Sequence, residues 1–184
     1  MAMFVRRVIG AARLDAATYE EVEADPKTIT QAVAVVVVSS IAAGVGTAGS
    51  EAGVLGAVWI ALAALSGWFA WAVVTWLVGT RMLPEPQTQS NLGELLRTIG
   101  FSASPGILRI AALLPGVGQL IAFAAWLWML AAMVVAVRQA LDYKGTGRAI
   151  LVCVIGFFVQ VGVVFAITLA MGVSALAMGM LPGM

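Results

Sequence analysis

The stretch that decides the fold is DPKTITQAVAVVVVSSIAAGVGTAG, residues 25–49. Its centre, residues 32–38, holds only Ala and Val, and such a run would favour a β-strand in a soluble protein. The chain as a whole, however, is 62% hydrophobic and 10% charged, which indicates a membrane protein. Because a lone open strand in a bilayer leaves its backbone unpaired, we expect a transmembrane α-helix over residues 27–49. Asp25 is its expected N-cap, and Pro26 suits the first helical position.

Four further apolar stretches predict four more helices. The expected fold is therefore all-α, a polytopic bundle of five transmembrane helices in a domain of residues 27–184. The four helices cover residues 53–79, 99–114, 119–141 and 149–177, and a tight turn at residues 49–51 joins the first two helices of the bundle. The helix at 99–114 is short and contains Pro105, so it either crosses fully or forms a re-entrant hairpin with the next helix.

Residues 1–26 form a predicted cytoplasmic segment ahead of this domain. Its first part resembles a short helix lying in the headgroup region, because apolar side chains alternate there with basic ones. Phe4, Val8 and Leu14 would share one face, flanked by Arg6, Arg7 and Arg13. The acidic stretch TYEEVE, residues 18–23, is expected to be solvated as a helical turn capped by Asp15 or Thr18. The segment lacks the apolar core of a signal peptide.

The basic residues predict the orientation of the chain. Lys and Arg gather in cytoplasmic loops of membrane proteins, and a five-helix arrangement puts nine of the ten on one side. These nine are Arg6, Arg7, Arg13, Lys27, Arg81, Arg97, Arg138, Lys144 and Arg148. The N-terminus is therefore expected in the cytoplasm and the C-terminus on the opposite side. Within the basic loop that follows the second helix, residues 81–97, Asn91 and Glu94 have the spacing of a capping box, which predicts a short helix there.

The stretch that follows carries a family resemblance. Residues 96–156 read LRTIGFSASPGILRIAALLPGVGQLIAFAAWLWMLAAMVVAVRQALDYKGTGRAILVCVIG. The order of its features resembles the prokaryotic branch of the Yip1 domain family. These features are Leu96-Arg97, Gly100-Phe101, Pro105, Pro115-Gly116 with Gly118, Trp126 or Trp128, residues 136–141 and Arg148-Ala149. Tyr19, Asp25-Pro26 and Gln31-Ala32 extend the likeness toward the N-terminus.

The resemblance implies a five-helix membrane protein with a cytoplasmic N-terminus, here in a prokaryotic plasma (inner) membrane. Eukaryotic relatives bind Rab GTPases in vesicle trafficking. The motifs associated with those relatives, similar to Asp-Leu-Tyr-Gly-Pro and Gly-Tyr, are missing here, as is their long N-terminal region. A Rab interaction is therefore not carried over.

Composition excludes several chemistries. The chain has no His, and Cys153 is its one cysteine, which removes most zinc and haem sites and the nucleophilic triads. We therefore expect no catalytic residue, no cofactor and no metal. The net charge of +1 gives no global basic field for nucleic acid.

Four residues form the candidate polar site in the bilayer: Arg109, Pro105, Gln119 and Gln160. A central Arg costs about 2.5–3.5 kcal/mol on insertion scales, so Arg109 either anchors the fold or contacts an anion, a lipid headgroup or a solute. Pro105 allows a packing kink or a broken helix at a transport site. Gln160 is expected to form hydrogen bonds across helices.

Three functions stay open. The first is a non-enzymatic membrane protein that organises membrane lipids or partner proteins, as a homo-oligomer or with other membrane proteins. The second is an accessory subunit of a larger complex, with Trp68, Trp71, Trp126 and Trp128 as a contact surface. The third is a small transporter or channel that uses Arg109 and the Pro105 kink.

Overall fold

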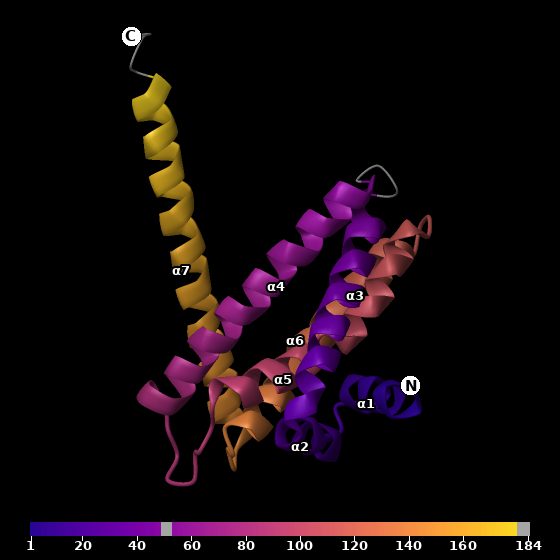
Figure 1. Ribbon diagram of the computed structural model, residues 1–184, viewed down its shortest axis with the longest axis vertical. Coiled ribbons are helices and arrows are strands. Elements are labelled where there is room, and N and C mark those ends of the chain that lie inside the picture. The colour runs from indigo at the N-terminus through magenta and orange to yellow at the C-terminus, as the bar shows by residue number, and fades with distance from the viewer. Residues whose placement is uncertain (49–52, 180–184) are drawn as a thin grey trace.

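The computed structural model describes residues 1–48 and 53–179, and every regular element in that part of the chain is a helix. The long helices are α3 (Ile29–Ala48), α4 (Gly53–Leu77), α6 (Gly118–Ala140) and α7 (Thr146–Gly179). The shorter ones are α1 (Ala2–Ala12), α2 (Ala16–Ala24) and α5 (Leu92–Ser102) (Figure 1). The all-α prediction is confirmed. The turn expected at residues 49–51 lies outside the described residues.

Three helical segments are long and apolar enough to cross a membrane: Pro26–Gly46, Val58–Met82 and Gly118–Ala140. They correspond to the helices predicted at 27–49, 53–79 and 119–141. The first begins as expected, because Asp25 Oδ1 accepts a hydrogen bond from the Lys27 backbone N–H at 3.0 Å and Pro26 opens a 3-10 turn, η1 (Pro26–Thr28). The first part of α7 is an apolar helix as well. The total of five crossings remains a prediction.

The prediction of one α-helix over residues 99–114 is wrong. The capping box of Asn91 and Glu94 forms as predicted, but the helix that it starts, α5, continues to Ser102. A 3-10 helix, η3 (Ser104–Leu113), follows. Pro105 has no N–H to donate and disfavours the α conformation in the residue before it, so the α-helix ends there. At about 2 Å per residue η3 rises about 20 Å, short of the roughly 30 Å hydrocarbon core.

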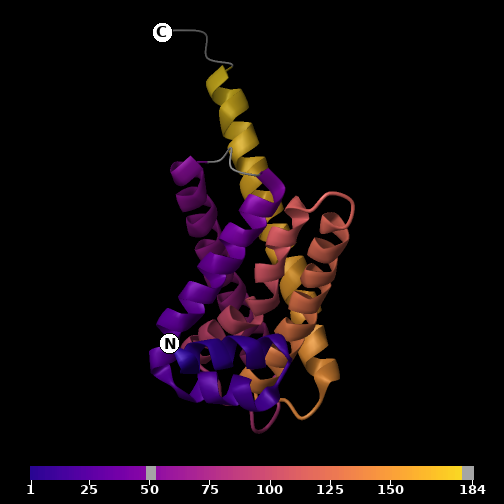
Figure 2. The same ribbon diagram turned by 90° about the vertical axis from the view of Figure 1, so that its right-hand side faces the viewer.

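The 3-10 helix η3 lies between α3 and α6. Two glycines make this approach possible, since a Cβ at Gly46 would clash with the carbonyl oxygen of Arg109, and one at Gly106 would clash with Ser39 Oγ. Gly118, at the start of α6, lies equally close to backbone atoms of Ala111 and Ala112. The three elements therefore form a tight layer. The end of α7 projects beyond the rest of the bundle (Figure 2).

The loop that follows α4 and the loop between α6 and α7 are the two basic loops. They lie at one end of the bundle, beside α2 (Figure 1). Hydrogen bonds join them: Thr88 donates to the Leu141 carbonyl at 3.0 Å, and Arg148 to the Pro84 carbonyl at 2.9 Å. A π-helical turn, η2 (Val78–Met82), extends α4 into this end. The Tyr143 hydroxyl secures it by donating to the carbonyls of Gly79 and Leu83 at 3.1 and 2.8 Å.

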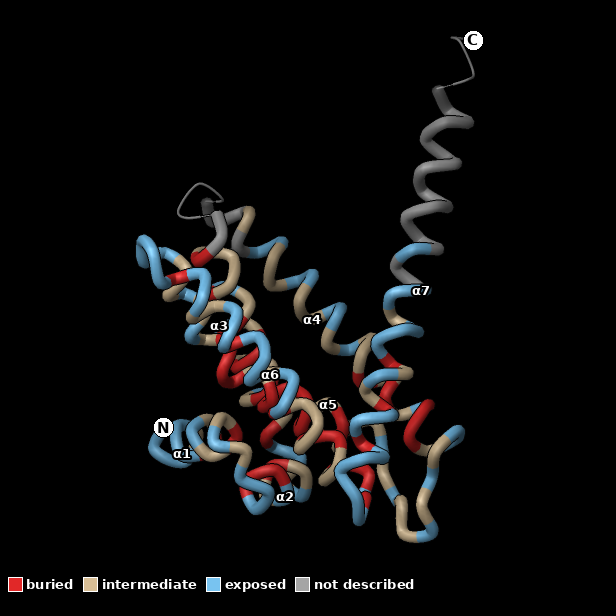
Figure 3. Tube along the Cα trace, turned by 180° about the vertical axis from the view of Figure 1, so that it is seen from behind, coloured by how far each residue is buried: buried red, intermediate tan, exposed pale blue. Residues whose placement is uncertain are grey.

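The N-terminal helices pack onto this end of the bundle. Residues 18–23 were expected to be solvated, and that prediction is wrong, because Tyr19 and Val22 are fully buried. Figure 3 shows buried positions along α2. They pack against α1, α3 and α5 in a cluster with Ala11, Ala32, Val35 and Phe101. The cap expected from Asp15 does form, with Oδ1 accepting from the Ala17 backbone N–H. TYEEVE looks solvated because half of its residues are acidic, but Tyr19 and Val22 on its inner face are buried.

Candidate functional site

A cavity of about 300 Å³ lies between α4 and α7 on one side and α5 and α6 on the other. Its walls are mostly large and apolar. They consist of Val36, Gly67, Trp68, Trp71, Ile99, Ser102, Ala103, Trp126, Met129, Leu130, Met133 and Gln160. This lining holds no carboxylate, cation or thiol, so the cavity can bind an apolar group and hydrogen-bond a polar one, but offers no acid or base.

The tryptophans give the cavity a rigid wall. Trp68 donates its indole N–H to the Leu96 carbonyl at 3.1 Å, which ties α4 to α5. Trp71 packs its ring 3.7 Å from where a Cβ on Gly156 would lie, so α7 passes close to α4 here. Trp126 is 46% exposed and stacks on Phe123, with ring centroids 6.0 Å apart. The indole of Trp126 is therefore exposed and already held in place, so it can contact a ligand or a partner.

Gln160 brings an amide, with both donor and acceptor groups, into the lining of the cavity. Its side chain is half-buried on α7, and within the described residues no hydrogen bond joins its amide to another group. The bond across helices that the sequence predicts is therefore not made inside this part of the chain. Ser102, also in the lining, already donates to the Ile99 carbonyl at 2.7 Å, whereas the buried indole N–H of Trp71 has no partner within the described residues. The amide is left with its donor and acceptor capacity open toward the cavity.

The four residues of the predicted polar site are not brought together. Pro105 is buried at the start of η3, Arg109 is half-buried further along it, and Gln119 is exposed in the first turn of α6. Gln160 lines the tryptophan-rich cavity, and Pro105, Arg109 and Gln119 do not. The guanidinium of Arg109 forms no hydrogen bond or ion pair within the described residues.

A second polar arrangement, which the sequence did not predict, holds α1 and α2 on the bundle. Arg7 is 5% exposed, and its guanidinium meets Glu21 at 2.9 Å and Asp25 at 3.2 Å. It also donates to the Gln31 side chain at 3.2 Å. Arg7 was expected to flank the apolar face of its helix and lies instead in the contact between α1, α2 and α3. We call Arg7, Glu21, Asp25 and Gln31 the cap network.

Arg97 completes the attachment from α5. It is 8% exposed, and its guanidinium donates to the backbone carbonyls of Val22 and Glu23 at the end of α2. Those carbonyls have no partner inside their own helix, so a cation there also suits the helix dipole. Tyr19 adds a third link, donating to the Ala11 carbonyl at 3.1 Å, and burial raises its pKa. Tyr19 and Arg97 belong to the quoted resemblance, the one indication that sequence gave of their role.

The carboxyl of Glu23 has an unusual setting in this cap. Burial, with Asp142 and Glu94 nearby, raises its pKa to about 7, although Arg97 opposes the shift. It lines a cavity of about 620 Å³ with Glu20, Gln139 and Asp142. Glu23 therefore titrates near neutral pH at the contact between α2 and the basic loops.

Comparison with known proteins identifies the family. The sequence profile of the Yip1 domain matches residues 15–181, nearly the whole chain. No curated protein and no solved structure matches the chain. The matched range contains α2, the helices of the bundle, the tryptophan cavity and Arg97. With apolar helices of membrane-spanning length and a profile match over almost its full extent, this multi-pass membrane protein belongs to the Yip1 domain family.

Proposed function

We propose that this protein is a non-enzymatic membrane scaffold, and that its first partner is a second copy of the same chain docked at the tryptophan cavity. The observation that carries the proposal is the Gln160 amide, which lines an apolar cavity and has no hydrogen-bond partner in the described part of the chain. An unpaired amide in hydrocarbon costs several kcal/mol on transfer scales, about 4–8 at the upper end. A partner that hydrogen-bonds it removes that cost.

An exposed aromatic ring lies on the same face of α7 as Gln160 and could fill the tryptophan cavity of a second copy. Phe157, one turn before Gln160, is 55% exposed and stands edge-to-face with Phe158, their centroids 5.8 Å apart. A projecting ring beside a cavity is what a two-fold contact needs, because each copy then inserts its ring into the other. The two Gln160 amides would pair at the centre, a contact worth about 0.6–2 kcal/mol between membrane helices.

The orientation belongs to the proposal too. We place the end that carries α1, α2 and the basic loops in the cytoplasm of a prokaryotic plasma membrane, because Lys and Arg gather on that side. The cap network would then hold a small cytoplasmic platform above the membrane contact. An accessory subunit of a larger complex would use the same cavity for a helix of a different protein.

The transporter alternative rests on Arg109, a cation without a described partner on the 3-10 helix η3. We favour the transporter less than the scaffold, because neither Arg109 nor Pro105 lines the tryptophan cavity. Solute flux into reconstituted vesicles that Arg109→Ala abolishes would support transport over the scaffold.

Photo-crosslinking in native membranes tests the scaffold. A benzophenone amino acid replaces Leu130, which lines the cavity and is 47% exposed, or Leu120, which is 70% exposed in the first turn of α6. We expect Leu130 to give a product of two chains and Leu120 to give none. Gln160→Leu, of similar size, should greatly reduce the product.

The remaining outcomes are also decisive. A product of equal yield from both positions, or lipid adducts alone from Leu130, contradicts a protein partner at the cavity. A product with one identified different membrane protein, lost in Gln160→Leu, replaces the second copy by the accessory-subunit alternative.

A further inference from the structure

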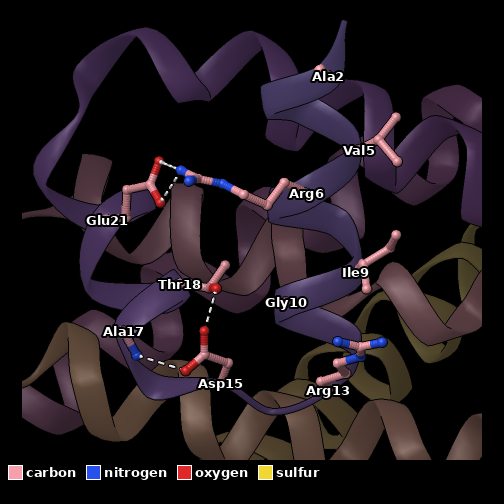
Figure 4. Close-up of a pocket in the computed structure, with 10 residues that line it drawn as sticks. All are labelled: Ala2, Val5, Arg6, Ile9, Gly10, Arg13, Asp15, Ala17, Thr18 and Glu21. Atoms are coloured by element: carbon pink, nitrogen blue, oxygen red, sulfur yellow. Dashed lines mark hydrogen bonds and ion pairs between the residues drawn. The ribbon is translucent and has the colours of Figure 1, made fainter.

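The cleft between α1 and α2 has the composition of a lipid-binding site. It encloses about 730 Å³ and opens to the outside of the molecule. Val5, Arg6 and Ile9 contribute from α1, and Thr18 and Glu21 from α2, while Arg13 and Asp15 lie in the turn between the two helices (Figure 4). We infer that this cleft binds the headgroup of an anionic phospholipid, with Arg13 as the main contact.

The exposed face of α1 is divided into an apolar and a basic strip. At 100° per residue, Val5 and Ile9 lie side by side, and Arg13 and Arg6 lie next to them on the same face. Val5 and Ile9 are 49% and 45% exposed, and the side chain of Arg6 is 66% exposed. An interfacial helix needs this arrangement, with apolar groups toward the acyl chains and cations toward the phosphates.

The two carboxylates of the cleft are already engaged, which leaves a cation for the ligand. Asp15 accepts hydrogen bonds from the Thr18 hydroxyl at 2.6 Å and the Ala17 backbone N–H at 3.3 Å. Glu21 lies between Arg6 and Arg7. Within the described residues Arg13 has no ion pair or hydrogen bond from its side chain. Asp15 keeps its charge, but its oxygens accept from Thr18 and Ala17, so Arg13 is the charged side chain at this end of the cleft whose hydrogen-bonding groups no described residue occupies.

The position of α1 places this cleft at a headgroup depth. Phe4 and Val8 share a small apolar cavity with Val35 and Val38, which belong to the membrane-spanning segment Pro26–Gly46. Close to Arg13, the Ala12 carbonyl accepts a hydrogen bond from the Trp128 indole at 2.7 Å, on the spanning helix α6. One flank of α1 thus packs against apolar spans, while its charged flank faces outward.

The apolar strip distinguishes a lipid from a free phosphate compound. A soluble anion gains nothing from Val5 and Ile9, whereas a phospholipid lays its acyl chains on them while its phosphate reaches Arg13. Each basic residue near an anionic surface strengthens attachment by about fivefold. A zwitterionic lipid carries no net charge to recognise.

Native mass spectrometry of the detergent-purified full chain measures this binding. The protein is titrated with phosphatidylglycerol or with phosphatidylcholine of identical acyl chains. We expect the wild-type chain to bind phosphatidylglycerol more tightly, Arg13→Gln to weaken that binding about fivefold, and Arg13→Lys to retain most of it. Binding of phosphatidylcholine should stay unchanged in all variants.

Arg81→Gln is the matched control, because Arg81 is exposed in the turn after α4 and does not line the cleft. An equal loss in Arg81→Gln would mean that overall charge, not the cleft, attracts the lipid, and would overturn the inference. So would a wild-type chain without preference between the two lipids. Full competition by soluble glycerol phosphate would replace the lipid by a free phosphate ligand. Because Gln160 takes no part, failure here is separate from failure of the scaffold.

Discussion

Arg7 is the residue on which attachment of the N-terminal helices depends most. It is 5% exposed and faces two carboxylates, so removing it leaves Glu21 and Asp25 close together without their shared cation. Because both acids keep some contact with water, we expect Arg7→Met to lower the free energy of unfolding by about 2 kcal/mol. Thermal unfolding in detergent measures this. Arg6→Gln is the control, with an effect within about 0.5 kcal/mol, and an equal effect of the two variants would contradict the cap network.

Glu23 gives the cap a dependence on pH. Its pKa is raised to about 7, so the folded state binds a proton that the unfolded state, with an ordinary value near 4.5, releases. Stability therefore rises as pH falls from above 7 toward 4.5. Because the carboxyl is partly exposed and solvent screens it, we expect a rise of about 1 kcal/mol, below the roughly 3 kcal/mol that 1.4 kcal/mol per pKa unit would give. Glu23→Gln should be more stable than wild type at pH 8.5, and the gain should disappear at pH 5. A gain that is independent of pH would refute this origin.

At the residue scale, sequence predicted the local interactions and missed the distant ones. Asp25 and the pair Asn91 and Glu94 act within a few residues of themselves, so their spacing is enough to identify the caps. Arg7 pairs with acids 14 and 18 positions away, and Arg97 reaches the end of α2, 74 and 75 positions away. Nothing in local spacing separates these buried arginines from the exposed Arg6 and Arg13.

Among the elements, the packing of η3 against α3 depends on Gly46. A Cβ there would clash with the backbone of Arg109, which cannot move as a flexible side chain can. We expect Gly46→Ala to destabilise the fold by about 1–3 kcal/mol, the usual cost of overpacking. Gly67→Ala in α4 meets nothing within 4 Å and should be neutral or stabilising by up to about 1 kcal/mol. Thermal unfolding compares them, and equal melting temperatures would contradict the close α3–η3 contact.

Sequence identified most elements because apolar length and caps are strong predictors in a membrane protein. The spans that begin at Pro26 and Val58 and the helix α6 lie where expected. The sequence predicted one helix over residues 99–114 and left a kink or a break open at Pro105. The observed change from α-helix to 3-10 helix depends on the close contact with α3 and α6. The π-helical extension of α4 likewise depends on Tyr143, a residue far along the chain.

For the whole molecule, the joined basic loops support one topology. We predict that a cysteine at Val117, exposed in the turn before α6, and one at Thr146, exposed at the start of α7, face opposite sides of the membrane. In a Cys153→Ser background, a membrane-impermeant maleimide applied to intact cells should label Val117→Cys and spare Thr146→Cys until the cells are opened. Labelling of both from one side would rule out a crossing by α6.

The candidate site could be predicted only in its parts. The sequence identified Gln160 and the deep tryptophans separately, because polar and aromatic residues stand out within apolar helices. It did not place them together, since the cavity arises from the way α4 and α7 meet α5 and α6. It also favoured Arg109, which the structure places away from the cavity walls.

The central claim is that Gln160 and the tryptophan cavity hold a second copy of the chain. Native mass spectrometry of the protein ejected directly from its own membranes tests it, because no detergent then competes for the cavity. We predict a species of twice the 19.0 kDa chain mass for the wild type and for the control Gln119→Leu. Gln160→Leu should give mainly single chains. A wild-type protein that is released only as single chains, or a two-chain species that survives Gln160→Leu undiminished, would contradict the account.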